Sequence, residues 1–216
     1  MRSDAASGIL LIAGSAAGLF VMSHHPTAHQ LLDREHLAHT ARLNAHIHGI
    51  AIAAVPAVFL GLLGLARRLG PSHLTTAALV VYGLGSIALI SAAVASGFVA
   101  TPVAERTLAA EGSAREIYHG LLWYTGRLNQ GFAQVAVVAS SVAILLWSGA
   151  IFAGGSISRA AGAGGALVGA GVLVAFYSGL LPLDVHGFGI VTLAQSAWQI
   201  WVGALLMRSQ AAPGPA

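Results

Sequence analysis

The chain contains six long apolar stretches, and none of them carries a charged residue. A helix needs about 20 apolar residues to cross the hydrocarbon core of a membrane. The stretches run continuously rather than alternating with a period of two, which argues against the strands of a transmembrane barrel. The pattern therefore predicts six membrane-spanning helices, at about residues 5–22, 49–66, 75–99, 132–151, 160–181 and 188–207.

The first stretch has two interpretations. Arg2 precedes it, as a short basic region would precede the apolar part of a secretory signal. No small-residue cleavage site follows the stretch, and His24, His25 and Pro26 occupy that position. We expect a retained membrane helix, with a cleaved signal peptide as the alternative.

The composition agrees with a membrane protein. Hydrophobic residues make up 56% of the 216 residues and charged residues only 8%, whereas a soluble globular chain carries about 25% charged residues. Cysteine is absent, which excludes disulfides and thiolate metal ligands. The ten arginines are scattered rather than gathered in a basic stripe, so we expect no nucleic-acid partner. The absence of lysine is typical of GC-rich coding and suggests a bacterial source.

The loops predict that both ends of the chain face the cytoplasm. Each side of the membrane would hold five arginines, so their number alone does not decide the orientation. The predicted inner loops are short and carry one acidic residue, Asp4, whereas the outer segments are long and carry six. We expect a single domain, residues 1–216, in the lipid bilayer of the bacterial cytoplasmic membrane.

Two long outer segments, about residues 23–48 and 101–131, are expected to be partly helical. Residues 115–128 predict a helix that lies along the membrane and leads into the fourth span, with Trp123 and Tyr124 at the level of the lipid headgroups. A faint internal repeat is also present, because Arg42-Leu43-Asn44 opens the second span much as Arg127-Leu128-Asn129 opens the fourth.

Pairs of glycines indicate where helices approach each other closely. Gly14 and Gly18, like Gly165 and Gly169, are spaced four residues apart and so share one face of a helix. Such faces pack helices within a bundle, and they would also allow a homo-oligomer. The fold class predicted is an all-α integral membrane protein, a six-transmembrane-helix bundle with a histidine-rich outer cap.

Histidine is the unusual component of that cap. Seven of the ten histidines fall within 25 consecutive residues, from His24 to His48. Neutral imidazole is a common protein ligand for Zn, Cu and Fe, and several imidazoles must converge on one ion. On a regular helix His39 and His46 differ by only about 20°, whereas His48 lies about 200° from His46. The metal ligands that we predict are His36, His39, His46, His119, Asp184 and His186.

A b-type haem is a particular form of this hypothesis. Two axial histidines from different helices would hold it, with His46 or His48 paired with His119 or His186. The chain has no CxxCH motif, which excludes covalent attachment of a c-type haem. The metal or haem site would serve metal handling or electron transfer.

Two other functions stay open. One is a small-solute permease or an accessory membrane protein whose histidines bind nothing. None of the spans carries an ionisable residue at depth, which argues against proton coupling, but Gln134, Gln195 and Gln199 could face a small uncharged solute. The other is a metal-dependent membrane enzyme, for which the sequence offers neither an HExxH nor a GxSxG motif.

Overall fold

Helices are the regular secondary structure throughout the part of the chain that the structure describes, and short turns connect them. The structure is a computed structural model and describes residues 2–26, 30, 35 and 37–208. Its elements are α1 (Arg2–Ser23), α3 (Leu37–Leu69), α4 (His73–Val94), the π-helical segment η1 (Ala95–Ala100), α5 (Thr101–Ala109), α6 (Gly112–Gly154), α7 (Arg159–Tyr177) and α8 (Val185–Arg208). The prediction of an all-α chain is therefore confirmed for these residues.

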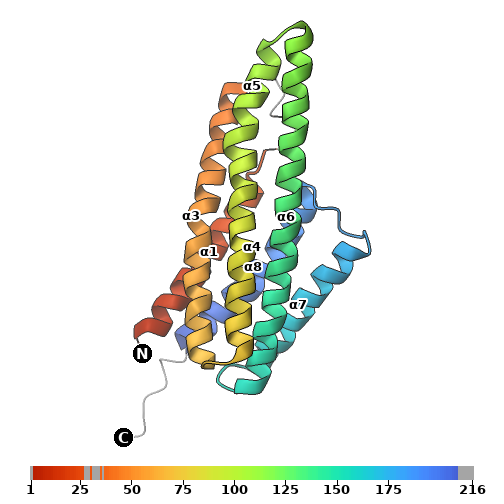
Figure 1. Cartoon of the computed structure of the whole chain (residues 1–216). Helices are drawn as coiled ribbons and strands as arrows, with labels where there is room; N and C mark the ends of the chain where they lie inside the picture. Colours follow the sequence, from red (N-terminus) through yellow and green to blue (C-terminus); the bar gives the residue numbers. More distant parts are fainter. Residues whose placement is uncertain (1, 27–29, 31–34, 36, 209–216) are drawn as a thin grey trace, which may run out of the picture.

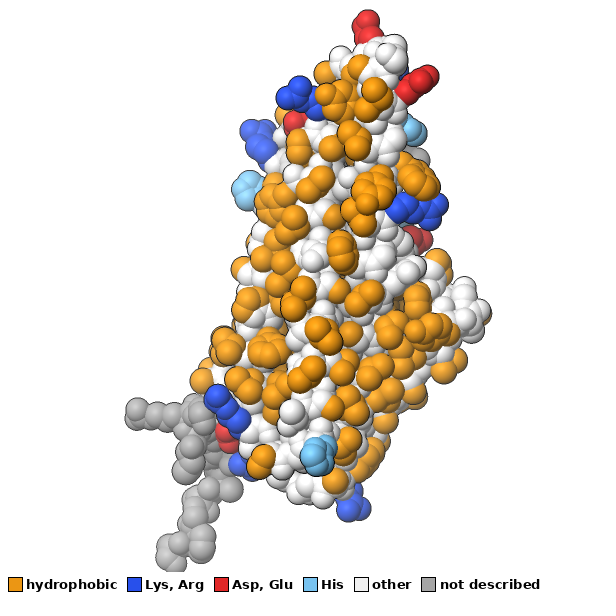
Figure 2. Space-filling model, viewed as in Figure 1, with side chains coloured by type: hydrophobic (Ala, Val, Ile, Leu, Met, Phe, Trp, Pro, Cys, Tyr) orange, Lys and Arg blue, Asp and Glu red, His pale blue; other side chains and the backbone are white. Residues whose placement is uncertain are grey.

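Six helical segments are long and apolar enough to cross a membrane, as the hydropathy pattern predicted. Each overlaps one of the six predicted stretches. Large apolar side chains such as Leu84, Ile87 and Leu167 are exposed on the outside of the bundle, where lipid chains would cover them. Figure 2 shows hydrophobic side chains over the middle of the molecule and charged ones toward its two ends.

The six spans form a closed ring. Along it, α1 packs on α3, α3 on α4, α4 on α6, α6 on α7, α7 on α8, and α8 on α1. Figure 1 shows α3, α4 and α6 side by side, with α1 and α8 crossing behind them. Glycines allow neighbouring helices to approach each other closely. For example, Gly61 of α3 lies against α1, and a Cβ at this position would be only 2.8 Å from the Leu11 backbone nitrogen. The glycines predicted to pack do so within the chain: Gly14 meets Val58 of α3, and Gly169 meets α6.

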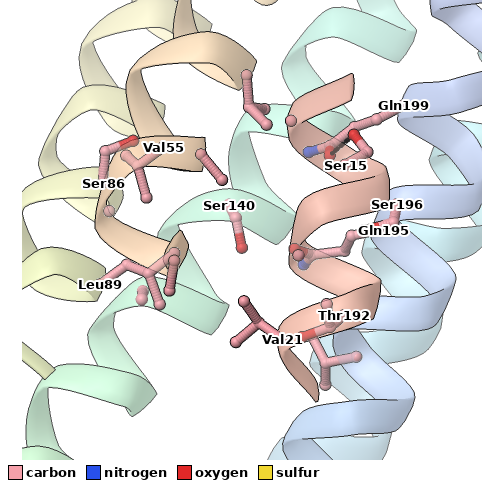
Figure 3. A pocket seen from close by; sticks show the side chains of 18 of the residues that line it. Ser15, Val21, Val55, Ser86, Leu89, Ser140, Thr192, Gln195, Ser196 and Gln199 are labelled. Carbon is pink, nitrogen blue, oxygen red and sulfur yellow. Dashed lines mark hydrogen bonds between the residues drawn. The ribbon is translucent and has the colours of Figure 1, made fainter. Parts of the chain in front are cut away.

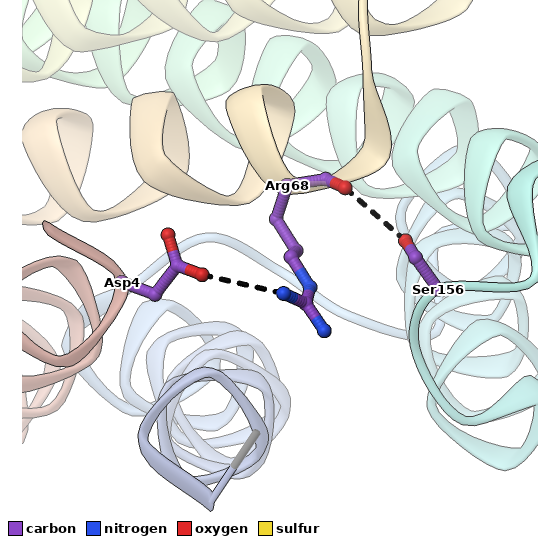
Figure 4. Close-up of polar contacts among 3 residues, drawn as sticks. All are labelled: Asp4, Arg68 and Ser156. Atoms are coloured by element: carbon purple, nitrogen blue, oxygen red, sulfur yellow. Dashed lines mark hydrogen bonds and ion pairs between the residues drawn. The ribbon is translucent and has the colours of Figure 1, made fainter. Parts of the chain in front are cut away.

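One end of the bundle, the short-loop end, carries the start of α1, the end of α8 and the short connections after α3 and α6. The Arg68 guanidinium lies 3.5 Å from the Asp4 carboxylate, and Ser156 Oγ donates to the Arg68 carbonyl oxygen at 3.2 Å (Figure 4). These contacts join α1, α3 and the α6–α7 connection. Because both charged side chains are partly exposed, the pair contributes less than about 1 kcal/mol.

The opposite end, the protruding end, consists of helices that continue beyond the spans. α6 is one helix of 43 residues, and α5 packs against its first half (Figure 1). The predicted helix at residues 115–128 exists, as the first part of α6 rather than as a separate helix. It continues directly into the fourth span, because no proline or helix-ending glycine interrupts residues 112–154. α3 likewise begins twelve residues before its predicted span, at Leu37.

A π-helical segment, η1, joins α4 to α5. Pro102 has no N–H to donate to the carbonyl four residues before it, so one α-helical hydrogen bond is missing where η1 meets α5. The fully buried Asn44 of α3 fills the opening: its Nδ2 donates to the Ser96 carbonyl oxygen and to Thr101 Oγ1, both at 2.9 Å. Thr101 Oγ1 in turn donates to the Gly97 carbonyl oxygen. Asn44 therefore fixes α3 against η1.

The Asn44→Ala variant tests this connection. Removing the amide leaves the Ser96 carbonyl oxygen without its side-chain donor, so we expect the free energy of unfolding to fall by about 1–3 kcal/mol. The measurement is denaturant unfolding of the purified protein in detergent micelles. Asn129→Ala is the matched control, because Asn129 occupies the equivalent place in the sequence repeat and is only half-buried. Equal losses in the two variants would contradict the role given to Asn44.

Candidate functional site

The predicted metal ligands lie at separate places on the surface. His39 and His46 are exposed on α3, and His119 is exposed on α6. Asp184 precedes α8 and His186 lies in its first turn, both exposed; His36 lies outside the described residues. Among the described residues, no three histidine or acidic side chains come together as a metal ion would require.

Asp184 has a structural task at the start of α8. Its Oδ1 accepts a hydrogen bond from the Gly187 backbone N–H at 2.8 Å, which satisfies one of the free amides of the first helical turn. A Cβ on Gly187 would collide with the Pro182 carbonyl oxygen, so glycine is needed there for the chain to turn tightly. The capping bond explains the Asp184 carboxylate without a metal ion.

Two other histidines do meet within the described part of the chain. His25 follows α1 and His48 lies on α3, and their Nε2 atoms are 3.3 Å apart. The rings meet edge to face, with centroids 4.9 Å apart. His48 is 4% exposed and His25 is half-buried. His46 is exposed while His48 is buried, which agrees with the predicted difference in their directions on the helix.

The second nitrogen of each ring determines its protonation. His25 Nδ1 lies 2.8 Å from the Pro26 carbonyl oxygen, and His48 Nδ1 lies 2.8 Å from the Asn44 carbonyl oxygen. A carbonyl oxygen only accepts hydrogen bonds, so each Nδ1 carries the proton. In the neutral rings both Nε2 atoms then present lone pairs to each other, an arrangement that a cation between them would stabilise.

The position of His48 depends on a glycine of the π-helical segment. A Cβ on Gly97 would lie 2.6 Å from His48 Cγ, closer than real Cβ atoms approach a ring. Residue 97 must therefore lack a side chain for the ring to occupy its place, while the Asn44 carbonyl orients that ring. Sequence reasoning missed this pair because His25 and His48 are 23 residues apart, and no local spacing joins them.

Burial lowers the pKa of His25, because the surroundings solvate the imidazolium less well than water does. The hydrogen bond to the Pro26 carbonyl acts in the opposite direction and is weaker. At neutral pH the ring is consequently neutral. A neutral ring offers its Nε2 lone pair to a metal ion.

A second site lies deeper in the bundle, as a cavity of about 140 Å³. Five of the six spans line it, and α7 contributes nothing. Figure 3 shows hydroxyl and amide side chains from four helices around this space, among them Ser15 of α1, Ser86 of α4, Ser140 of α6 and Gln195 of α8. Val21, Val55 and Leu89 supply apolar parts of the wall.

The cavity begins one helical turn below the histidine pair. Its lining includes Met22, three residues before His25, and Ala51, three residues after His48. At its far end lie Tyr82 and Gln199. Below them the bundle is filled by a fully buried apolar core that includes Trp147, Leu62 and Leu65. The histidine pair thus lies next to the upper part of the cavity, toward the protruding end.

Comparisons with protein-family models, with curated proteins and with solved structures gave no match for this chain. The functional argument therefore depends on the geometry of these two sites.

The lowered pKa of His25 predicts how stability depends on pH. Its pKa is lower in the folded protein than in the unfolded chain, so below about pH 6.5 the unfolded state binds more protons. The free energy of unfolding should fall as the pH drops through this range, by at most about 1.4 kcal/mol per pH unit for one group. The measurement is unfolding in detergent with a chelator between pH 7 and pH 5.

His25→Gln should flatten this part of the pH profile. His46→Gln is the matched control, because His46 is exposed on α3, two residues before His48, and belongs to neither described site. Identical pH profiles for the wild type and His25→Gln would contradict the prediction.

Proposed function

We propose that this membrane protein binds a transition-metal ion at its protruding end, through Nε2 of His25 and Nε2 of His48, and that the protruding end faces outward. The observation that carries the proposal is the approach of two lone-pair nitrogens to 3.3 Å, each on a ring whose other nitrogen donates to a backbone carbonyl.

The distance favours a particular coordination geometry. Two nitrogens bound at about 2.0–2.1 Å to a tetrahedral ion lie about 3.3–3.4 Å apart. Adjacent ligands of an octahedral ion at similar bond lengths would lie about 3.0 Å apart, and opposite ligands about 4 Å apart. The separation of 3.3 Å between the two Nε2 atoms fits the tetrahedral case. Zn²⁺ and Cu⁺ are the ions that we propose, because both accept imidazole in tetrahedral sites.

The hydrogen bonds around the pair resemble those that hold the histidine ligands in known metal sites. Metal-bound histidines usually donate their other ring N–H to a carbonyl or carboxylate, which fixes the tautomer and the direction of the lone pair. Both carbonyl partners are backbone atoms, so no side-chain motion is needed to keep them in place. The rings are therefore oriented before an ion arrives.

Two imidazoles leave part of a tetrahedral shell for other ligands. A recess beside His25 is lined by His24 and His39 as well, and it gives water access to the pair. Because no third histidine or acidic side chain of the described residues joins the pair, water would complete the shell, and His39 lies beside the proposed site rather than in it. His46, His119 and His186 are not part of the proposed site.

Haem fits this pair poorly. Axial histidines bind a haem iron from opposite sides, with the porphyrin plane between their nitrogens. Such nitrogens lie about 4 Å apart on a line through the iron, whereas these two are 3.3 Å apart with rings meeting edge to face. A free metal ion is therefore the form of the metal hypothesis that the geometry favours, with metal handling as its role.

Metal binding by the pair gives a direct test. The protein, purified without a histidine tag and treated with a chelator, should bind about one equivalent of Zn²⁺ or Cu⁺ in equilibrium dialysis with elemental analysis. His25→Gln and His48→Gln should each weaken metal binding at least about 100-fold. Even the loss of a group that only hydrogen-bonds to a ligand lowers metal affinity about 10–100-fold. Gly97→Ala should weaken it as well, because the new Cβ displaces the His48 ring.

His46→Gln and His186→Gln are the matched controls for this experiment. Both histidines are exposed and lie near the same end of the spans, yet neither belongs to the proposed site. Retained binding in His25→Gln and His48→Gln, or loss of binding in the two controls, would overturn the assignment.

The outward orientation of the protruding end is supported by charge. The short-loop end carries Arg67, Arg68, Arg159 and Arg208 in short connections or at helix ends, as expected of a cytoplasmic side. The absence of native cysteine makes the test simple. In spheroplasts, a membrane-impermeant maleimide should label Ser113→Cys, which is exposed on the first turn of α6.

Ser156→Cys, exposed in the connection after α6, is the matched variant. It should react only after the membrane has been permeabilised. Labelling of Ser156→Cys in intact spheroplasts, with protection of Ser113→Cys, would reverse the orientation.

A further inference from the structure

We infer that the cavity inside the bundle is a binding site for a small neutral solute that carries several hydrogen-bond donors, a molecule of the size of glycerol or urea. The inference goes beyond metal binding and does not depend on it, because the cavity is lined by different residues from the histidine pair. It rests on three properties of the cavity: the lack of charged side chains in its lining, the hydrogen-bond acceptors that the lining presents, and the volume.

The lining favours a neutral ligand. No Asp, Glu, Lys, Arg or His is among the residues that line the cavity. A charged solute in this membrane-embedded space would lose its hydration without meeting an opposite charge, which costs far more than a few hydrogen bonds return. Water and uncharged polar solutes do not meet this barrier.

Three hydroxyl groups of the lining present oxygen rather than hydrogen to the cavity. Ser86 Oγ donates to the Tyr82 carbonyl oxygen at 2.9 Å, Ser140 Oγ to the Val137 carbonyl oxygen at 3.1 Å, and Thr192 Oγ1 to the Phe188 carbonyl oxygen at 2.9 Å. Each hydroxyl has only one proton, and its own helix uses it. The remaining lone pairs accept hydrogen bonds from a ligand.

One of the two glutamines of α8 extends this pattern. Gln195 Nε2 donates to Ser141 Oγ at 3.0 Å. The amide oxygen of Gln195 can therefore accept a hydrogen bond from a ligand. Gln199 Oε1 accepts from Ser15 Oγ at 2.8 Å, and the same side chain hydrogen-bonds to Tyr82, so both of its ends are engaged within the protein. The three helix-bonded hydroxyls and the Gln195 amide oxygen therefore present acceptors, which a solute rich in O–H or N–H groups matches.

The size of the cavity limits the solute. A water molecule occupies about 30 Å³ in the liquid, and an engineered protein cavity of about 150 Å³ holds benzene. The cavity measures about 140 Å³, so it takes one molecule of about six non-hydrogen atoms or a few waters. Glycerol meets the requirements of size, neutrality and donor number, and urea meets them with fewer atoms.

Solute binding is tested with the purified full-length protein in detergent, using saturation-transfer NMR with glycerol and with urea as separate probes. Acetate and methylammonium are the charged probes of similar size. We expect glycerol or urea to bind with millimolar affinity, and neither charged probe to bind. Because the site is independent of the metal, His48→Gln should bind the neutral solute as the wild type does.

Two serines of α4 provide a matched pair of variants. Ser86 and Ser91 both donate to the carbonyl four residues earlier at 2.9 Å, but only Ser86 lines the cavity. Ser86→Leu places an apolar side chain in the cavity and should weaken solute binding at least tenfold, whereas Ser91→Leu should leave it unchanged. Thr192→Val keeps the shape of the side chain and replaces its hydroxyl with a methyl group, so it should weaken solute binding severalfold. This variant takes the place of Ser86→Leu if Ser86→Leu does not fold.

Three outcomes would overturn the inference: no binding of glycerol or urea to the wild type, equal binding of a charged probe, or equal affinity in the Thr192→Val and Ser91→Leu variants. The inference and the proposed metal function fail separately. Loss of solute binding in His48→Gln alone would mean that the solute occupies the histidine pair instead of the cavity.

Discussion

The hydrogen bonds that Asn44 makes across the interface between α3 and η1 organise the protruding half of this molecule. At η1 the helical hydrogen-bond pattern changes, and no water within the bilayer could replace the lost bonds. Asn44 supplies them: its amide donates to Ser96 and Thr101 across the interface between α3 and η1. The backbone carbonyl of the same residue orients the ring of His48 one turn later. One interaction thus ties helix packing to the candidate metal site.

The two halves of the ring differ in how they are filled. Toward the short-loop end, large side chains such as Trp147, Leu62 and Ile151 are fully buried and fill the interior of the bundle. Toward the protruding end, Gly14, Gly18 and Ser140 stand where larger residues would close the bundle. Small residues bring helix backbones together but fill little volume, so a cavity remains where several helices present them at one level. Both candidate sites lie in this less densely filled half.

Hydropathy alone was sufficient to predict the six spans, because the length and apolarity of a spanning helix are local properties of the sequence. The helical angle between His46 and His48 likewise predicted that they point in different directions from α3, and in the structure only His46 is exposed. The approach of His25 to His48 could not be predicted, since it depends on how α1 ends against α3. The capping role of Asp184 was missed for a related reason: a carboxylate beside a histidine in the sequence fits a metal ligand and a helix cap equally well.

The chemistry of the two sites follows from their depth. A metal ion keeps its charge, so it needs ligands where water and polar groups still reach, and the half-exposed His25 meets that condition at the end of α1. One turn deeper, the lining carries only hydroxyl, amide and apolar groups, in an environment where an unpaired charge is too costly to hold. Imidazole, whose lone pair is available while the ring stays neutral, is the side chain that suits the boundary between these two environments. The change from imidazole to hydroxyl and amide side chains along the inside of the bundle is therefore the change expected on passing from the rim of a membrane into its core.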